Sequence, residues 1–469
     1  MEKAVRIQNV MYIVMSFAPR PTVSRMMQTC RALNKEGVKY ILHDDVNLHL
    51  NVPEEITSFF LFIIADPHPR LRSVRGLSLT PHHFMRRSEK IQDGVPERLK
   101  NLFVLLAALG EKFVRLELCE ADEILQLHPD LPDAVASLTR LQDLKMIGAG
   151  SVSCKMLRNL RSSLCSALIT MLDSEDDPSL TPEDKILTVS LQNSQSTLQA
   201  LQMAQGETIP DGPCYPKVIV LDLAETWTFT THHFTHAFPN LREFFIRDSF
   251  VEALDVDVDQ DDLTTVREEN LSLQRLHESW KALDLYSGGL GILYALGLTC
   301  PIAEVRLDDT DGDGFDGDVL QAVLGDARPV SLTISLSDGF DLAEPEVVSA
   351  LRERCAAELG KLELHLKFKP QEAAFDLQLE LRALLDAICS LIDSSVVTAF
   401  ELELSLECSS FMKDCKICEP SSIIFNGIDE TAYTDLLFAK GKNLKTVHLT
   451  LCHKHYGSNR KREVKRVQN

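Results

Sequence analysis

The sequence has no long hydrophobic run. Apolar runs such as residues 59–65, which end at Asp66, and residues 102–109 are far shorter than the roughly 18 apolar residues that a membrane-spanning helix needs. The first residues contain an acid, Glu2, and no apolar run that leads to a small-residue cleavage site, so they do not resemble a secretory signal. We therefore expect no membrane partner and an intracellular location, in the cytoplasm, the nucleus or both.

Basic residues are scarce relative to acidic ones. The 469 residues include 48 Lys and Arg against 69 Asp and Glu, which gives a formal net charge of -21 at pH 7 and a pI near 5.1. A surface of that charge repels a phosphate backbone, so nucleic acid is not an expected partner. The 12 cysteines are sparse and follow no disulfide-framework spacing, which predicts reduced thiols.

Motifs of common catalytic sites are missing as well. The chain has no Gly-x-Ser-x-Gly turn, no Walker A loop and no His-Glu-x-x-His motif. We therefore predict a protein that is not an enzyme, with no catalytic residue and no cofactor.

The chain repeats a six-residue pattern, apolar-x-x-apolar-x-apolar, many times. Its last positions alternate apolar with polar residues, which predicts short strands with one face in water. The pattern occurs at Val74/Leu77/Leu79, Phe113/Leu116/Leu118, Leu141/Leu144/Met146, Leu198/Leu201/Met203, Val218/Leu221/Leu223, Leu241/Phe244/Ile246, Trp280/Leu283/Leu285, Ile302/Val305/Leu307, Leu359/Leu362/Leu364, Val397/Phe400/Leu402 and Leu444/Val447/Leu449.

Stretches between these hexads have helical spacing, for example Val319, Leu320, Val323 and Leu324. Strand and helix therefore alternate, and successive hexads begin about 20 to 57 residues apart. One such strand and helix cannot bury their apolar faces alone, but stacked copies form a continuous core. The sequence thus predicts an α/β fold in which residues 73–452 form an irregular solenoid of alternating strands and helices.

Residues 1–45 contain no hexad and have a helical period. Val10, Ile13, Val14 and Phe17 share one helical face, and two prolines then separate this helix from the next helical stretch. We predict a separate helical module over residues 1–45, joined to the solenoid by a linking helix within residues 46–72.

The hexads resemble leucine-rich repeats of the irregular, long-repeat kind. The clearest copies are Pro239-Asn-Leu-Arg-Glu-Phe244 and Leu141-Gln-Asp-Leu144, and the resemblance covers roughly residues 72–452. It implies a curved array whose strand face holds a protein partner.

The N-terminal module resembles an F-box, and in particular that of the F-box proteins with leucine-rich repeats that are expanded in fungi. The resemblance rests on the stretch from Val23 to Leu33, which contains Met-Gln-Thr-Cys-Arg-Ala-Leu, although Ile7-Gln-Asn-Val10 replaces the usual Leu-Pro of the first helix. It implies binding to a Skp-type adaptor of a cullin-RING ubiquitin ligase. The implied adaptor contacts are Met11, Ile13, Phe17, Met27, Cys30 and Leu33.

One short cysteine motif is a weak candidate for a metal site. Cys415-Lys-Ile-Cys418 has a chelating spacing for zinc, with Cys408 before it and Cys452 and His453 after it. A single Cys-x-x-Cys without a second pair has low specificity, and an ordinary loop with unpaired thiols is the alternative.

Two segments depart from the average charge. Residues 253–270 include five aspartates and are predicted to form an acidic, disordered insertion. Residues 453–469 are predicted to form a basic tail, either a solvated end or a nuclear-import signal. The residues of that signal would be Arg460, Lys461, Arg462, Lys465 and Arg466.

These observations lead to one hypothesis and two alternatives. The hypothesis is a non-enzymatic substrate receptor of an SCF-type ubiquitin ligase, which binds a Skp-type adaptor through the N-terminal module and an unknown protein client through the solenoid. The negative net charge favours a client with basic character. The alternatives are a leucine-rich-repeat scaffold without a role in ubiquitin transfer, and a zinc protein or enzyme built around the cysteine motif.

Overall fold

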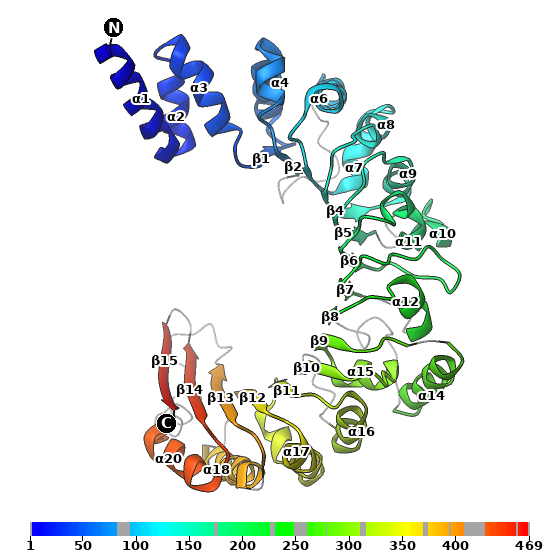
Figure 1. The fold of residues 1–469 in the computed structure, drawn as a ribbon, viewed down its shortest axis with the longest axis vertical. Helices are drawn as coiled ribbons and strands as arrows, with labels where there is room; N and C mark the ends of the chain where they lie inside the picture. The colour runs from blue at the N-terminus through cyan, green and yellow to red at the C-terminus, as the bar shows by residue number, and fades with distance from the viewer. Residues whose placement is uncertain are drawn as a thin grey trace. The chain divides into compact units, whose positions relative to one another are not determined.

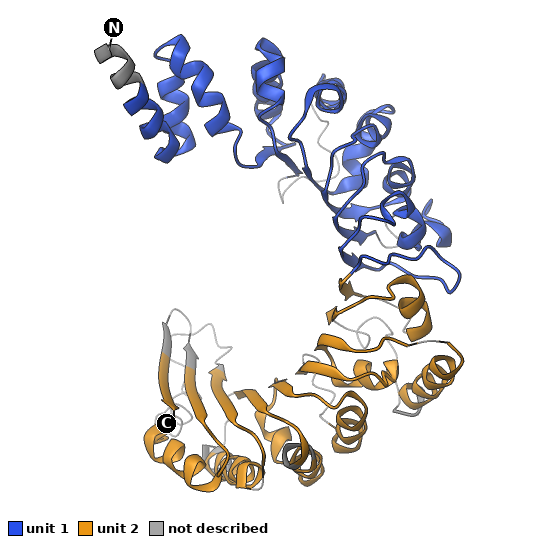
Figure 2. Cartoon of the chain, viewed as in Figure 1, with its two compact units in different colours: residues 1–218 blue, residues 219–469 orange. Residues whose placement is uncertain are grey.

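The structure is a computed structural model. It describes residues 2–81, 94–172, 177–225, 230–247, 260–277, 279–309, 316–368, 374–393, 395–407, 427–455 and 458–467. The chain divides into two compact units, residues 1–218 and residues 219–469 (Figure 2). Each unit contains both helices and strands, so the predicted α/β class is confirmed.

Unit 1 begins with three helices and continues with alternating strands and helices. The first three are α1 (Glu2–Phe17), α2 (Arg20–Met27) and α3 (Arg31–Ile41). The strands are β1 (Val46–His49), β2 (Gly76–Thr80), β3 (Arg115–Cys119), β4 (Asp143–Ala149), β5 (Ser166–Met171) and β6 (Ala200–Ala204). Between them lie α4 (Pro53–Ala65), α5 (Pro67–Leu71), α6 (Val95–Leu109), α7 (Ala121–Gln126), α8 (Leu131–Ala136), α9 (Ser151–Asn159), α10 (Pro182–Lys185), α11 (Leu187–Ser190) and the 3-10 turn η1 (Gln192–Ser194).

Unit 2 continues the same alternation. Its strands are β7 (Val220–Ala224), β8 (Glu243–Arg247), β9 (Leu283–Gly288), β10 (Ile302–Asp309), β11 (Ser331–Leu336), β12 (Lys361–Phe368), β13 (Ala399–Glu407), β14 (Thr446–His455) and β15 (Ser458–Val467). Its helices are α12 (Thr231–Ala237), α14 (Gln260–Leu276), α15 (Leu290–Leu296), α16 (Gly317–Ala327), the 3-10 helix η2 (Gly339–Ala343), α17 (Pro345–Ala357), α18 (Ala374–Asp393) and α20 (Glu430–Lys440).

Strands that are consecutive in the sequence are neighbours in space within each unit. In unit 1, β1 to β6 pair in order and in parallel. In unit 2, β7 to β14 pair in the same way, and β15 is antiparallel to β14. The described helices cover one face of the strands in each unit and leave the other face open (Figure 1).

The parallel register lines up the apolar positions of the hexads. In unit 1, Leu77 lies opposite Leu116, which lies opposite Leu144. In unit 2, Leu364 lies opposite Leu402, which lies opposite Leu449. All six side chains are at most 3% exposed, so the aligned apolar positions form the core between strands and helices. Every predicted hexad lies at a strand of the structure.

One hexad was predicted in the wrong frame. At Trp280/Leu283/Leu285 the pattern places Leu285 in the core, but Tyr286 is buried there instead, opposite Phe244 of β8. The strand therefore uses Leu283, Tyr286 and Gly288. A Cβ atom at Gly288 would lie 2.8 Å from the Tyr286 hydroxyl oxygen, so the large ring takes the space of the next side chain.

Three segment predictions also need correction. The linking segment 46–72 holds not only α4 and α5 but also β1, which pairs with β2. Residues 260–270 of the predicted acidic insertion belong to α14, whereas residues 253–259 lie outside the described part of the chain. The predicted basic tail 453–469 is not a free end, because its described residues complete β14 and form β15.

Polar contacts explain why the acidic segment becomes helical. The Asn270 side chain is 2% exposed; it accepts a hydrogen bond from the Thr231 N–H (2.9 Å) and donates one to the Ala295 carbonyl (2.8 Å). One turn earlier, Arg267 donates to the Tyr294 carbonyl at 2.9 Å. These contacts fix α14 between α12 and α15 even though its sequence is strongly charged.

The aligned core predicts that truncating a buried apolar side chain lowers the free energy of unfolding much more than truncating an exposed one. Leu364→Ala should lower the free energy of unfolding by about 2–5 kcal/mol, because the 0% exposed side chain leaves a cavity between two strands. Val330→Ala, at a 58% exposed side chain, should change it by less than about 0.5 kcal/mol. Urea unfolding followed by circular dichroism measures both, and equal losses would contradict the assignment of the core.

Candidate interaction surface

The N-terminal helices pack around four apolar side chains. Met15 of α1, Val23 and Met27 of α2 and Leu33 of α3 are all at most 7% exposed. The packing of α3 is close at Gly37, where a Cβ atom would come within 2.7 Å of Met15 Cε. The three helices therefore have a small core of their own, formed by one face of each helix.

The opposite face of α1 is apolar and open to solvent. Val10, Ile13, Val14 and Phe17 follow the helical spacing of three and four residues, so they lie on one stripe. Their side chains are 57%, 59%, 46% and 86% exposed. Four large apolar side chains in a row are more than the scattered surface residues of an ordinary helix, and such patches mark interaction sites. We call these four residues the α1 stripe.

The structure separates the six predicted adaptor contacts into two groups. Ile13 and Phe17 belong to the α1 stripe, Cys30 is exposed and Met11 is half-buried. Met27 and Leu33 are in the core of the three helices, at 6% and 7% exposure. The contact of Met27 and Leu33 with a partner stays a prediction, and the structure gives these two side chains a packing role inside the three helices. Val10 and Val14 also belong to the α1 stripe, although they were not among the predicted contacts.

Charge placed in the core should affect folding, whereas charge placed on the stripe should not. Met27→Asp with Leu33→Asp should unfold the three helices, because burying a carboxylate without a partner costs several kcal/mol. Ile13→Asp with Phe17→Asp should leave the helix content within error of the parent chain. Far-ultraviolet circular dichroism and the melting temperature distinguish the two variants, and a folded core variant would contradict this packing.

The open strand face of unit 1 is polar, and several of its charged side chains form ion pairs with one another. Lys145 of β4 forms an ion pair with Glu117 of β3 at 2.7 Å, and Arg115 reaches Asp45 at 3.0 Å. The hydrogen bond from Lys145 lowers the pKa of the Glu117 carboxyl. These side chains and Leu168 line a shallow depression on β2 to β5. Such a surface offers charge and apolar contact together, as the rim of a protein interface does.

The open face of unit 2 is organised around His448 of β14. Its Nδ1 lies 2.9 Å from the Glu401 carboxylate of β13, and its Nε2 lies 2.6 Å from the Glu463 carboxylate of β15. His448 therefore places one ring nitrogen beside each of two carboxylates and joins three neighbouring strands. His365 of β12 lies near two further carboxylates, 3.8 Å from Glu363 and 3.7 Å from Glu403.

The bridge predicts a pH dependence for the attachment of β15. The hydrogen bond from His448 lowers the pKa of the Glu463 carboxyl. A carboxyl with a lowered folded pKa stabilises the fold above its unfolded pKa of about 4.3, and this stabilisation is lost as pH falls through the folded pKa. His448→Ala should bring the pKa of Glu463 nearer to its ordinary value, as carboxyl chemical shifts in an NMR titration would show. An unchanged Glu463 titration would contradict the bridge.

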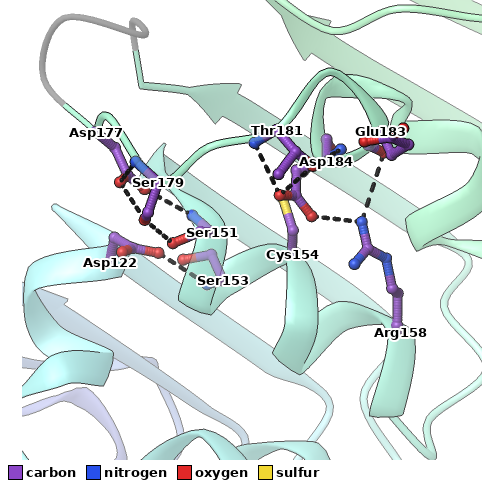
Figure 3. A network of polar contacts seen from close by, with 10 residues as sticks. All are labelled: Asp122, Ser151, Ser153, Cys154, Arg158, Asp177, Ser179, Thr181, Glu183 and Asp184. Carbon is purple, nitrogen blue, oxygen red and sulfur yellow. Dashed lines mark hydrogen bonds and ion pairs between the residues drawn. The ribbon is translucent and has the colours of Figure 1, made fainter.

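A dense polar cluster in unit 1 joins α9 to its neighbours (Figure 3). Asp122 of α7 accepts hydrogen bonds from the N–H groups of Gly150 (3.0 Å) and Ser153 (2.8 Å). Asp177 accepts from the Ser151 N–H at 2.9 Å. Two carboxylates thus satisfy the free N–H groups at the start of α9, a role that the helix dipole favours.

The same cluster contains Cys154, which has no features of a nucleophile. Burial raises the pKa of its thiol to about 12, and the thiol donates to the Asp184 carbonyl at 3.4 Å. Arg158 is paired with the Asp184 carboxylate at 2.5 Å, and Thr181 and Asp184 form a capping box at α10. A reactive cysteine needs an accessible thiolate, so these contacts are suited to packing rather than catalysis.

The predicted metal candidates are only partly described. Cys408, Cys415 and Cys418 lie outside the described residues. Cys452 is half-buried on β14, and His453 follows it in the same strand. Among the described residues, no group of three or more His, Cys, Asp or Glu side chains is arranged to hold a metal ion.

The residues of the predicted import signal belong to β15. Among those whose side chains are described, Arg462 pairs with Glu430 of α20 at 2.9 Å and Arg466 pairs with Asp435 of the same helix. Lys461 lies 3.4 Å from Glu463. Arg462 and Arg466 are therefore engaged in the fold instead of being presented on a free tail.

Comparisons with known proteins add no family assignment. No family model matches the chain, and no curated protein matches its sequence. Within the described residues, no helix is both long and apolar enough to span a membrane.

Proposed function

We propose that the chain is a non-enzymatic substrate receptor of an SCF-type ubiquitin ligase. Its N-terminal helices bind a Skp-type adaptor, and residues after them form a leucine-rich-repeat-like solenoid whose open strand face holds a protein client. The α1 stripe is the observation that carries the proposal.

The chemistry of the α1 stripe favours a helical, apolar partner. Val10, Ile13, Val14 and Phe17 present side chains at the spacing that fits into the groove of a helical partner. The 86% exposed Phe17 is suited to act as an anchor, since large apolar side chains at the centre of an interface contribute most of its binding energy. An adaptor with an apolar groove would bury surface that the described residues leave in water.

Two features support the solenoid. Each parallel strand follows its predecessor in space within a unit, and the hexad residues stack in register as repeated copies would. A parallel sheet normally has helices on both faces, yet here one face carries alternating charged residues such as Glu363 and Glu401. A solvated face of this kind suits a client with polar and basic character.

Adaptor binding tests the proposal directly. The purified chain should form a complex with a Skp-type adaptor in size-exclusion chromatography. Ile13→Asp with Phe17→Asp should weaken the complex about a hundredfold, because it removes two apolar anchors and brings charge to the interface. Titration calorimetry measures the loss, and circular dichroism verifies that the variant is folded.

A matched control is available in the same unit. Leu61 and Ile64 of α4 are also apolar and exposed, at 54% and 41%. Leu61→Asp with Ile64→Asp adds the same charge away from the α1 stripe and should leave adaptor affinity unchanged. Absence of a complex at micromolar concentration would overturn the receptor role and leave a scaffold without a part in ubiquitin transfer. An equal loss in both variants would show that the α1 stripe is not the contact.

A further inference from the structure

Strand β15 is an edge strand along its full length. Its ten residues pair with β14 from His455↔Ser458 to Thr446↔Val467 on one side. No described strand pairs with its other side, where it ends the sheet of unit 2 (Figure 1). An edge strand exposes a row of backbone N–H and C=O groups that can pair with another extended chain.

The charge of β15 is opposite to that of the protein. Residues 458–467 contain five basic residues and one acidic residue, in a chain with a net charge of -21. On the side that faces α20, Arg462 and Arg466 are neutralised by acidic residues of that helix. On the open face, Lys461 and Lys465 are exposed, and Lys465 has no ion-pair partner among the described residues.

We propose that the free edge of β15 binds an extended, acidic segment of a partner protein, which adds to the sheet as a further strand. Backbone pairing supplies the affinity, and carboxylates on the added strand meet Lys461 and Lys465. This interaction does not depend on the adaptor proposal, because β15 and the α1 stripe belong to different units.

The charge pattern selects this occupant over two others. A second copy of the chain would place its own basic β15 against this one, and like charges on paired strands repel each other. A nucleic acid would meet the lysines but has no peptide groups to pair with the free backbone, and the negative net charge disfavours its approach.

The test uses the full chain and a labelled short peptide of alternating valine and glutamate, with fluorescence anisotropy as the readout. The peptide should bind saturably. A version with the same charges and N-methyl groups on alternate residues should bind at least about tenfold more weakly, because each lost N–H removes a backbone hydrogen bond. A valine–lysine peptide should not bind.

Charge variants of the chain test the role of the lysines. Lys461→Glu with Lys465→Glu should weaken peptide binding by about tenfold or more through reversed side-chain charges. Lys442→Glu with Lys445→Glu, at exposed positions before β14, changes the net charge equally and should leave binding unchanged. Equal melting temperatures of the two variants would show that β15 is still attached.

Three results would each overturn the proposal. Equal binding of the N-methylated peptide would mean electrostatic attraction without strand addition. Tighter binding of a short DNA duplex than of the acidic peptide would assign the basic strand to nucleic acid. Absence of peptide binding, with aggregation when Lys461 and Lys465 are replaced by valine, would mean that the lysines only protect the edge from self-association.

Discussion

The parallel register of consecutive strands is the constraint on which the rest of the structure depends. Because each strand aligns its buried positions with those of the strand before it, as in Leu332, Leu362 and Phe400, one core runs through each unit. The helices only need to connect the end of one strand to the start of the next and to cover that core. Their lengths consequently vary widely, from four residues in α10 to twenty in α18. Irregular spacing of the hexads is therefore compatible with regular pairing of the strands.

Local patterns were sufficient to predict most strands, because the alternation of buried and exposed residues is a property of a few adjacent positions. The hexad pattern predicted the wrong buried residue in β9, because Leu285 and the adjacent Tyr286 are both apolar enough to fill the last core positions. Only the pairing of Tyr286 with Phe244 of β8 shows which of the two is buried. Strand β1 was missed because its four residues form too short a pattern. The pairing of β15 depends on backbone groups of β14, which no local pattern of basic residues reveals.

The candidate surface shows the same limit of prediction. An apolar stripe on a helix indicates burial or binding, but the sequence does not say which. Met27 and Phe17 both had the spacing of a contact residue, and packing against Met15 and Gly37 assigns the first to the core. The α1 stripe and the open strand faces also differ in chemistry. Binding to an apolar stripe is insensitive to salt, whereas binding to paired charges such as Lys145 and Glu117 weakens as ionic strength rises.

The capping of α9 bears on how such a chain can be divided or rearranged. The N–H groups at the start of this helix bind acceptors that lie far away in the sequence. Asp122 lies 28 residues before Gly150 and 31 residues before Ser153, and it accepts from both. Asp177, which accepts from Ser151, lies 26 residues after it. A segment cut at the boundaries of one strand and one helix would leave those N–H groups without acceptors. The smallest piece that could be exchanged intact between related chains is therefore three consecutive strand–helix segments, from β3 to the residues that follow β5.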